Sequence, residues 1–528
     1  MQHQVPIVSL IYSAPKLVEA DPWMAFFPTG LGYIQAILHR HGYSCGLANF
    51  TGLSKKAARR YLEEKKPDIV GISMFTFNRN RCFELARIIK ELLPDVILVV
   101  GGPHPTHLSR EVFEECPQIS AVVSGEGELP MLEIADRLAK GLDWREAPSL
   151  IFRDGSKTAL SKPVKDLDSI GFPSERFLAD FFDDIDQLGY LITSRGCPAK
   201  CAFCNTPEYW GNKVRFRSSS SVIQEMKTLW EDYGLTYFNF RDDTFTTNKS
   251  RVLDICRKIE LSNIYPLWSC QSRANLIDED RLVAMVRAGC EFIQIGVEHG
   301  SNRILRILDK GIDLMQVRNV LTTVRKVGMN LGIYLITGIP SETMEDVEES
   351  VRLIKELLPH DVQISPLAVY PGTRLYSELI ASSTLPPDFF HNARDTEVFA
   401  RGMDEFTKIA IARLSLTAEK IKVKARYTPT DFRQQKKFLG WCVTTNILCG
   451  EAAEDADQIE DAFIQYSEII KHEPLNPWGW LKRALLNAKC GKKNAAKADL
   501  REVLNLTPKN REAIDVSREL GLNGDAIH

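Results

Sequence analysis

The feature that most constrains this chain is a run of three cysteines, Cys197, Cys201 and Cys204, which follows a strand-like segment at 190–194. Thiols at spacings of four and three can converge from one loop onto one inorganic centre. A structural zinc site normally fills four positions, and a [4Fe–4S] cluster normally takes four thiolates. A fourth cysteine is absent nearby, so the run predicts a centre with one position open to a substrate or cofactor. The alternatives are a zinc loop and three buried thiols.

Phe203 stands directly before the last cysteine, and the resulting C-x3-C-x2-C pattern resembles the cluster motif of radical S-adenosylmethionine (SAM) enzymes. The resemblance implies a [4Fe–4S] cluster on the three cysteines, with SAM chelating the open iron through its amino and carboxylate groups. It also implies reductive cleavage of SAM to a 5′-deoxyadenosyl radical that abstracts hydrogen from an unactivated carbon. The electron would come from a donor such as flavodoxin or ferredoxin.

Length, charge and cysteine usage exclude several classes of protein. The chain has 528 residues and a net charge of −3, which suggests more than one domain and argues against nucleic acid as the main partner. Its apolar runs fall short of the roughly 18 residues of a membrane span, and the N-terminus lacks the pattern of a signal peptide. The cysteines outside the run are scattered. Reduced thiols and a cytoplasmic location are therefore expected.

Residues 1–140 alternate continuous apolar strands with helices. We predict strands at 5–12, 67–73, 96–100 and 121–123 and helices at 31–41, 79–92 and 129–140. This alternation predicts an α/β domain with a doubly wound parallel sheet, whose ligand binds beyond the carboxyl ends of the strands. Small residues at those ends let a bulky ligand approach the backbone. They are Ser73, Thr76, Gly101, Gly102 and Gly125.

The segments 67–73, 99–106 and 122–128 resemble, in this order, the cobalamin-binding domain found upstream of many radical SAM enzymes. The resemblance implies cobalamin at the strand ends above, with Glu126 beside Gly125. Many such domains place a histidine after the first strand as a cobalt ligand, but the loop from Ser13 to Trp23 contains none. We therefore expect cobalamin with its base displaced and with no histidine of this chain on its lower face. The alternative is a domain that binds no corrin.

The central part of the chain repeats the alternation after a linker at 141–188, which carries a hairpin turn at Asp154-Gly155. Residues 189–395 hold predicted strands at 190–194, 236–241, 266–270, 292–297, 332–338 and 362–369, with helices between them. Strands at this spacing fit a partial (β/α)6 barrel, as in the radical SAM family. The chemistry of such barrels lies at the carboxyl ends of the strands.

Four of these strand ends carry residues that the resemblance assigns to SAM. Asp242 or Asp243 would hold the amino group, although a helix cap or a surface pair is an alternative for either. Arg273 would pair with the carboxylate through its planar fork. Glu298 would accept from the ribose hydroxyls, and Gly338 would lie beside the adenine.

The last quarter of the chain is predicted to be helical, with an extension at 396–440 and a repeated segment at 441–528. Ala462 recurs as Ala496 after 34 residues, and Pro474 recurs as Pro508. This period is similar to that of a tetratricopeptide (TPR) helical hairpin. Fewer than three repeats rarely stand alone, so the segment is expected to dock on the barrel or on a protein partner. A plain helical tail is the alternative.

The combined resemblance implies a cobalamin-dependent radical SAM enzyme, and a C-methyltransferase is the first hypothesis. The second is an oxidative cyclase or another radical rearrangement, similar in layout to the anaerobic Mg-protoporphyrin monomethyl ester cyclases. A corrinoid-binding scaffold that recruits partners through its TPR-like helices is a third hypothesis, from another class. The substrate could be a small molecule, lipid, tetrapyrrole or peptide.

Overall fold

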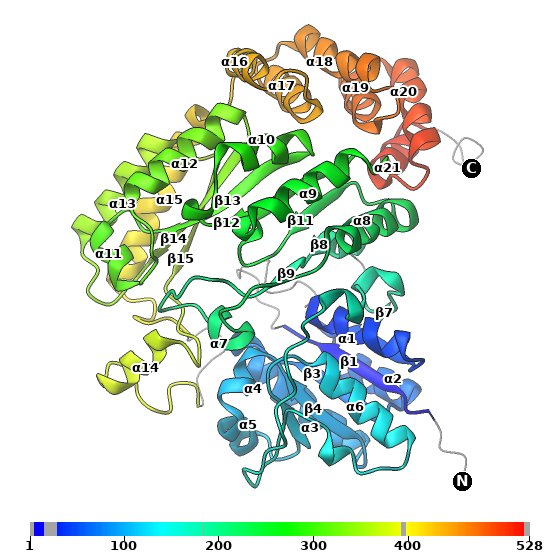
Figure 1. Ribbon diagram of the computed structural model, residues 1–528, viewed down its shortest axis with the longest axis vertical. Coiled ribbons are helices and arrows are strands. Elements are labelled where there is room, and N and C mark those ends of the chain that lie inside the picture. Colours follow the sequence, from blue (N-terminus) through cyan, green and yellow to red (C-terminus); the bar gives the residue numbers. More distant parts are fainter. Residues whose placement is uncertain (1–4, 15–28, 183, 392–397, 522–528) are drawn as a thin grey trace.

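The computed structural model describes residues 5–14, 29–182, 184–391 and 398–521. Two sheets form its centre, one in the lower part of Figure 1 and one in the middle, and a group of helices lies at the top. The α/β class predicted from the sequence is confirmed.

The first sheet has seven strands in the order β6-β5-β4-β3-β1-β2-β7, parallel except for the β5–β6 pair. The strand order reverses between β1 and β3, so a crevice lies at their carboxyl ends. Helices α1 and α6 cover one face, and α2, α3 and α5 cover the other. In chain order, strands β1–β7 are Val8–Tyr12, Cys45–Asn49, Ile69–Ser73, Ile97–Gly101, Ala121–Val123, Leu150–Ile151 and Ala179–Asp180. Helices α1–α6 are Thr29–Arg40, Lys55–Lys65, Arg79–Leu92, Pro103–His107, Ser109–Glu115 and Glu128–Ala139.

Three strands of this sheet were not predicted as its members. Strand β2 and helix α2 were missed, and β6 and β7 come from the segment expected to be a linker. The predicted turn at Asp154-Gly155 is present, because Ile151 pairs antiparallel with Lys157 across it. The first sheet therefore draws on more of the chain than residues 1–140.

The second sheet has six parallel strands in the order β15-β14-β13-β12-β11-β8, all six of which were predicted. Strands β8 and β15 lie at its two edges, so this partial barrel is open. Strands β8 and β11–β15 are Tyr190–Leu191, Tyr237–Phe240, Leu267–Ser272, Cys290–Glu298, Asn330–Thr337 and Asp361–Pro366, and helices α8–α15 are Ser219–Tyr233, Lys249–Glu260, Glu279–Arg287, Asn302–Ile307, Leu314–Val327, Met344–Leu357, Arg374–Ala381 and Glu405–Ala425.

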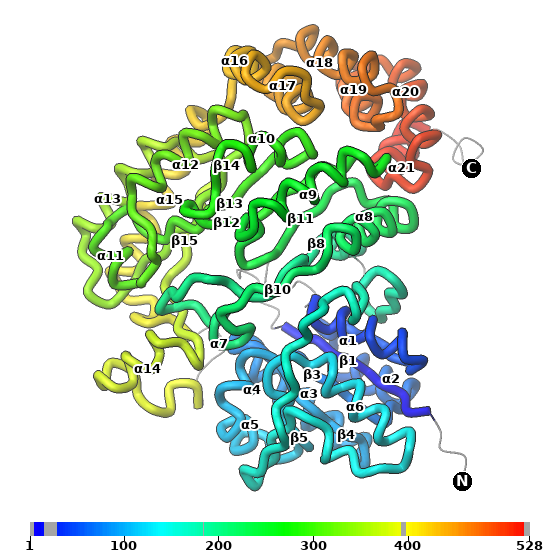
Figure 2. Tube along the Cα trace, viewed as in Figure 1, coloured from blue at the N-terminus to red at the C-terminus, as the bar shows by residue number. Residues whose placement is uncertain are grey.

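Helices α16–α21 lie against the amino-terminal ends of the barrel strands, at the top of the molecule in Figure 2. Trp478 donates from Nε1 to the carbonyl of Tyr265, just before β12, at 2.6 Å. Within the described residues, none of the helices is both long and apolar enough to cross a membrane. Helices α16–α21 are Pro429–Leu439, Val443–Asp455, Ile459–His472, Pro477–Lys489, Lys493–Leu506 and Arg511–Glu519.

Candidate active site: two adjoining cavities

The three cysteines lie on a loop that a short ribbon closes at its base. Strands β9 (Ser194–Arg195) and β10 (Arg215–Phe216) pair antiparallel on either side of this loop. Gly196 opens it with a φ of 98°, and a Cβ there would stand 3.1 Å from the carbonyl oxygens of Gly211 and Lys213. Glycine is therefore required immediately before Cys197. Helix α7 (Thr206–Trp210) follows Cys204 directly.

All three cysteines line one cavity of about 390 Å³ at the carboxyl ends of the barrel strands. We name it the cluster cavity. Among the described residues, no three His, Cys, Asp or Glu side chains are grouped as ligands of a single metal ion. A cubane cluster does not need such a group, because each thiolate binds a different iron. Three free thiols around one cavity fit a cluster with one open iron.

Arg273 and Glu298, which the resemblance assigned to SAM, both line the cluster cavity. Arg273 is buried, donates from Nη1 to Cys201 Sγ at 3.2 Å, and donates from Nη2 to the carbonyl of Lys310. Glu298 pairs with Lys310 at 2.6 Å, and both side chains are buried. Lys310 was not predicted, because it lies in a loop after α11 rather than at a strand end. The pair places a fixed carboxylate and a cation beside the three thiols.

The structure separates the two neighbouring aspartates. Asp243 lines the cluster cavity and accepts from Thr206 Oγ1 at 2.9 Å. Loss of hydration within the protein raises the pKa of Asp243 to about 6, and the negative charge of Asp242 acts in the same direction. Asp242 is buried outside this cavity, where its oxygens accept from the backbone of Thr193 and Ser194 and from the Thr193 hydroxyl. Asp243 is therefore the aspartate available to a ligand.

Replacing Arg273 by lysine is expected to weaken SAM binding while leaving the iron in place. Lysine keeps the charge but loses the planar fork, at a cost on the order of 1–3 kcal/mol, or roughly 5- to 150-fold in affinity. Titration of SAM into the reconstituted protein measures this change. Arg303→Lys is the control, because Arg303 pairs with Asp346 outside the cavity. Unchanged SAM affinity in Arg273→Lys, with normal iron content, would contradict the assignment.

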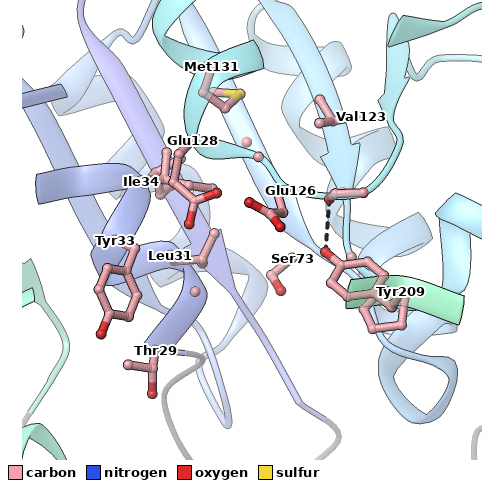
Figure 3. Close-up of a pocket in the computed structure, with 18 of the residues that line it drawn as sticks. Thr29, Leu31, Tyr33, Ile34, Ser73, Val123, Glu126, Glu128, Met131 and Tyr209 are labelled. Carbon is pink, nitrogen blue, oxygen red and sulfur yellow. Dashed lines mark hydrogen bonds between the residues drawn. The ribbon is translucent and has the colours of Figure 1, made fainter. Parts of the chain in front are cut away.

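A second cavity of about 290 Å³ opens at the carboxyl ends of the first sheet (Figure 3). We name it the sheet cavity. Gly102 has a φ of 116°, and a Cβ there would stand 2.5 Å from the Met74 carbonyl oxygen, so only glycine fits. Apolar side chains, among them Leu10, Val99 and Met131, form part of its wall, which suits an apolar ring system. Five predicted residues line it: Ser73, Gly101, Gly102, Gly125 and Glu126.

Two other predicted residues lie outside both cavities. Thr76 is buried and its Oγ1 is 3.2 Å from Nδ1 of His104, so its side chain is directed into the protein. Gly338 packs against α15, where a Cβ would stand 2.9 Å from Thr407 Oγ1. In both cases the chain turns beyond the strand end, and the residue lies away from the cavity. The loop from Ser13 to Trp23 lies largely outside the described residues.

Helix α7 joins the two cavities. Thr206 and Pro207, in its first turn, line the cluster cavity, whereas Tyr209 and Trp210 line the sheet cavity. Tyr209 donates to the carbonyl of Gly125 at 2.9 Å, as Figure 3 shows. These aromatic residues were missed in the sequence, although their position just after the cysteine run is a usable signal. The cluster loop therefore forms part of the wall of both cavities.

Comparisons with protein families agree with this architecture. The model of the radical SAM superfamily matches residues 191–354, and the model of the B12 binding domain matches residues 24–135. An uncharacterised methyltransferase of Pyrococcus horikoshii is 35% identical over 367 residues, covering 68% of this chain and 79% of the relative. The cytidylyl-2-hydroxyethylphosphonate methyltransferase of Streptomyces wedmorensis is 25% identical, covering 72% of this chain and 83% of the relative.

Solved structures show the same fold. The cobalamin-dependent SAM radical enzyme OxsB, with aqua-cobalamin and SAM bound, superimposes with a TM-score of 0.63 at 17% identity, covering 99% of this chain and 82% of that one. The radical SAM methyltransferase TsrM from Kitasatospora setae, with cobalamin and a [4Fe–4S] cluster, gives 0.62 at 20% identity, with coverages of 72% and 75%. The chain belongs to the radical SAM enzymes with a B12-binding domain. Its cofactors are a [4Fe–4S] cluster, SAM and cobalamin.

Proposed function

We propose that this enzyme transfers a methyl group to an unactivated carbon of a small-molecule substrate. The observation that supports the proposal is that residues of α7 line both cavities, so cobalamin in the sheet cavity would lie beside a cluster and SAM in the cluster cavity. The names of the two methyltransferase relatives support it. When bound, the cofactors supply reductive SAM cleavage and a transferable methyl group.

The residues of the chain would bind and orient these groups. Cys197, Cys201 and Cys204 would hold the cluster, and Arg273 would pair with the SAM carboxylate. Asp243 would accept from the SAM ammonium, and Glu298 would accept from the ribose hydroxyls. The wall shared by the two cavities would hold the substrate between the cofactors and limit the entry of water.

The proposal is tested with the anaerobically purified and reconstituted enzyme, supplied with SAM, cobalamin and a reductant. We expect 5′-deoxyadenosine to form. We also expect a compound that accumulates in a deletion strain to be converted into a product one methylene heavier. Product that forms equally well without cobalamin would contradict methyl transfer.

An oxidative cyclisation is the second candidate. The anaerobic magnesium-protoporphyrin IX monomethyl ester cyclase of Rubrivivax gelatinosus is 25% identical, covering 67% of this chain and 66% of the relative. The same assay separates the two reactions, because a cyclase product carries no added methyl group.

Cobalamin in the sheet cavity is expected to lack an imidazole ligand from this chain. None of the described residues that line this cavity is a histidine. The sequence from Ser13 to Trp23 contains none either. Electron paramagnetic resonance of the cob(II)alamin form measures the axial donor directly. Nitrogen splitting on the cobalt lines would show an imidazole and contradict this expectation.

We propose further that the last helices are TPR-like hairpins that dock on the barrel and leave their outer side to a protein partner. The 34-residue period and the hydrogen bond from Trp478 to the barrel support this. A flavodoxin or ferredoxin would supply the electron, and the free cysteines suit the cytoplasm.

A further inference from the structure

Arg195 lines the sheet cavity, two residues before Cys197, and is almost fully buried. Its side chain is 3% exposed. Nη1 donates to Glu126 Oε2 at 3.2 Å, and Nη2 donates to Glu128 Oε1. The guanidinium also lies 5.2 Å from the centre of the Tyr33 ring and 4.9 Å from that of the Trp210 ring. Two carboxylates and two aromatic rings therefore fix its position.

These partners all line the sheet cavity, but they come from two parts of the chain. Tyr33 lies on α1, Glu126 lies just before α6 and Glu128 is its first residue, around the sheet cavity in Figure 3. Trp210 ends α7, and Arg195 itself stands two residues before Cys197. One guanidinium thus connects the wall of the sheet cavity to the loop that carries the cluster cysteines.

A second arginine strengthens the same connection. Arg215 faces Arg195 across the ribbon at the base of the cluster loop. It donates to Glu126 Oε1 and, at 2.7 Å, to the carbonyl of Val164. Both strands of the ribbon therefore bind one carboxylate that lines the sheet cavity.

The buried guanidinium of Arg195 and its two carboxylate partners are expected to shift as one unit. Separating one partner would leave an uncompensated charge in a low-dielectric environment, which is strongly unfavourable. A ligand that shifts Glu126 or Glu128 in the sheet cavity must therefore shift Arg195 as well. Because Arg195 is nearly adjacent to Cys197, such a shift reaches the cluster loop.

We propose that Arg195 is a positioning residue that couples the two cofactor sites. Cobalamin in the sheet cavity and the cluster on its loop each favour the same arrangement of Arg195, Glu126 and Glu128. Thermodynamic linkage makes this coupling reciprocal, so each cofactor increases the affinity of the protein for the other. The inference rests on cobalamin and the cluster occupying the two cavities as proposed above.

Titration of hydroxocobalamin into the full-length protein, with and without its reconstituted cluster, tests the coupling. For the wild type we expect a dissociation constant about fivefold lower, or more, when the cluster is present. In Arg195→Lys the ratio should fall to about one, because lysine cannot bind both carboxylates. Arg483→Lys is the matched control, since Arg483 forms a forked pair with Asp499 in the C-terminal helices. It should keep the wild-type ratio.

Glu128→Gln is the second variant, because it preserves shape and removes one charge, and its ratio should also fall. The spectrum of the reduced cluster gives an independent readout: added cobalamin should change it in the wild type and leave it unchanged in Arg195→Lys. A wild-type ratio in both variants would overturn the inference, as would a ratio of one in the wild type. A wild type that binds no cobalamin at all would overturn the proposed function as well.

Discussion

The triple variant Cys197→Ala, Cys201→Ala and Cys204→Ala is expected to lose its iron completely. The brown absorption of thiolate-ligated iron near about 400 nm should disappear, and bound iron should fall from about four atoms per chain to none. The reason is geometric: these three thiols line the cluster cavity, and none of the other cysteines does. Without the cluster, SAM cleavage should stop. Iron analysis and absorbance after anaerobic reconstitution measure both changes.

A matched triple variant distinguishes loss of ligands from loss of fold. Cys442, Cys449 and Cys490 are free thiols of the C-terminal helical segment, far from the cavity in sequence. Their replacement by alanine should leave the iron content unchanged. The assignment would be wrong if the first variant kept about four irons per chain, or if the second lost them.

The barrel could be predicted from the sequence because its strands are read from local patterns. All six predicted barrel strands are present, and four of them, β11 to β14, end near a residue that the resemblance assigned to SAM. Strand β2 was missed because Cys45-Gly-Leu-Ala-Asn49 contains weak strand formers. Its conformation depends on pairing with β1, where Val8 lies opposite Cys45. Such tertiary pairing leaves no mark in a single local segment.

Predicted residues reach the cluster cavity where they lie directly at a strand end. Arg273 and Glu298 meet this condition, and both line the cluster cavity. Asp242 and Asp243 are adjacent in sequence beyond the end of β11, and only the path of the following turn decides which of them faces the cavity. Lys310 reaches Glu298 from the loop after α11, and the sequence pattern does not show that this loop folds back onto the end of β13. Arg195 was missed because its partners lie about 70 residues away, at Glu126 and Glu128.

Filling the sheet cavity is expected to abolish tight cobalamin binding without disturbing the cluster. Gly101 ends β4 and lines this cavity, and a Cβ there would stand 3.6 Å from the Cβ of Val123, an ordinary contact. Leucine at this position adds its bulk to a cavity of about 290 Å³. Overlap with a bound ring system should lower the affinity for cobalamin by about 100-fold or more, equivalent to about 2.8 kcal/mol.

Gly101→Ala is the control for this substitution. Its single methyl group fits beside Val123, so cobalamin affinity and the free energy of unfolding should change by no more than about 0.5 kcal/mol. Both variants should bind iron normally, because the cysteines line the other cavity. Absorbance titration with hydroxocobalamin compares the two variants with the wild type. If Gly101→Leu bound cobalamin as tightly as the wild type, the corrin would occupy another part of the molecule, and the shared wall formed by α7 would no longer connect the two cofactors.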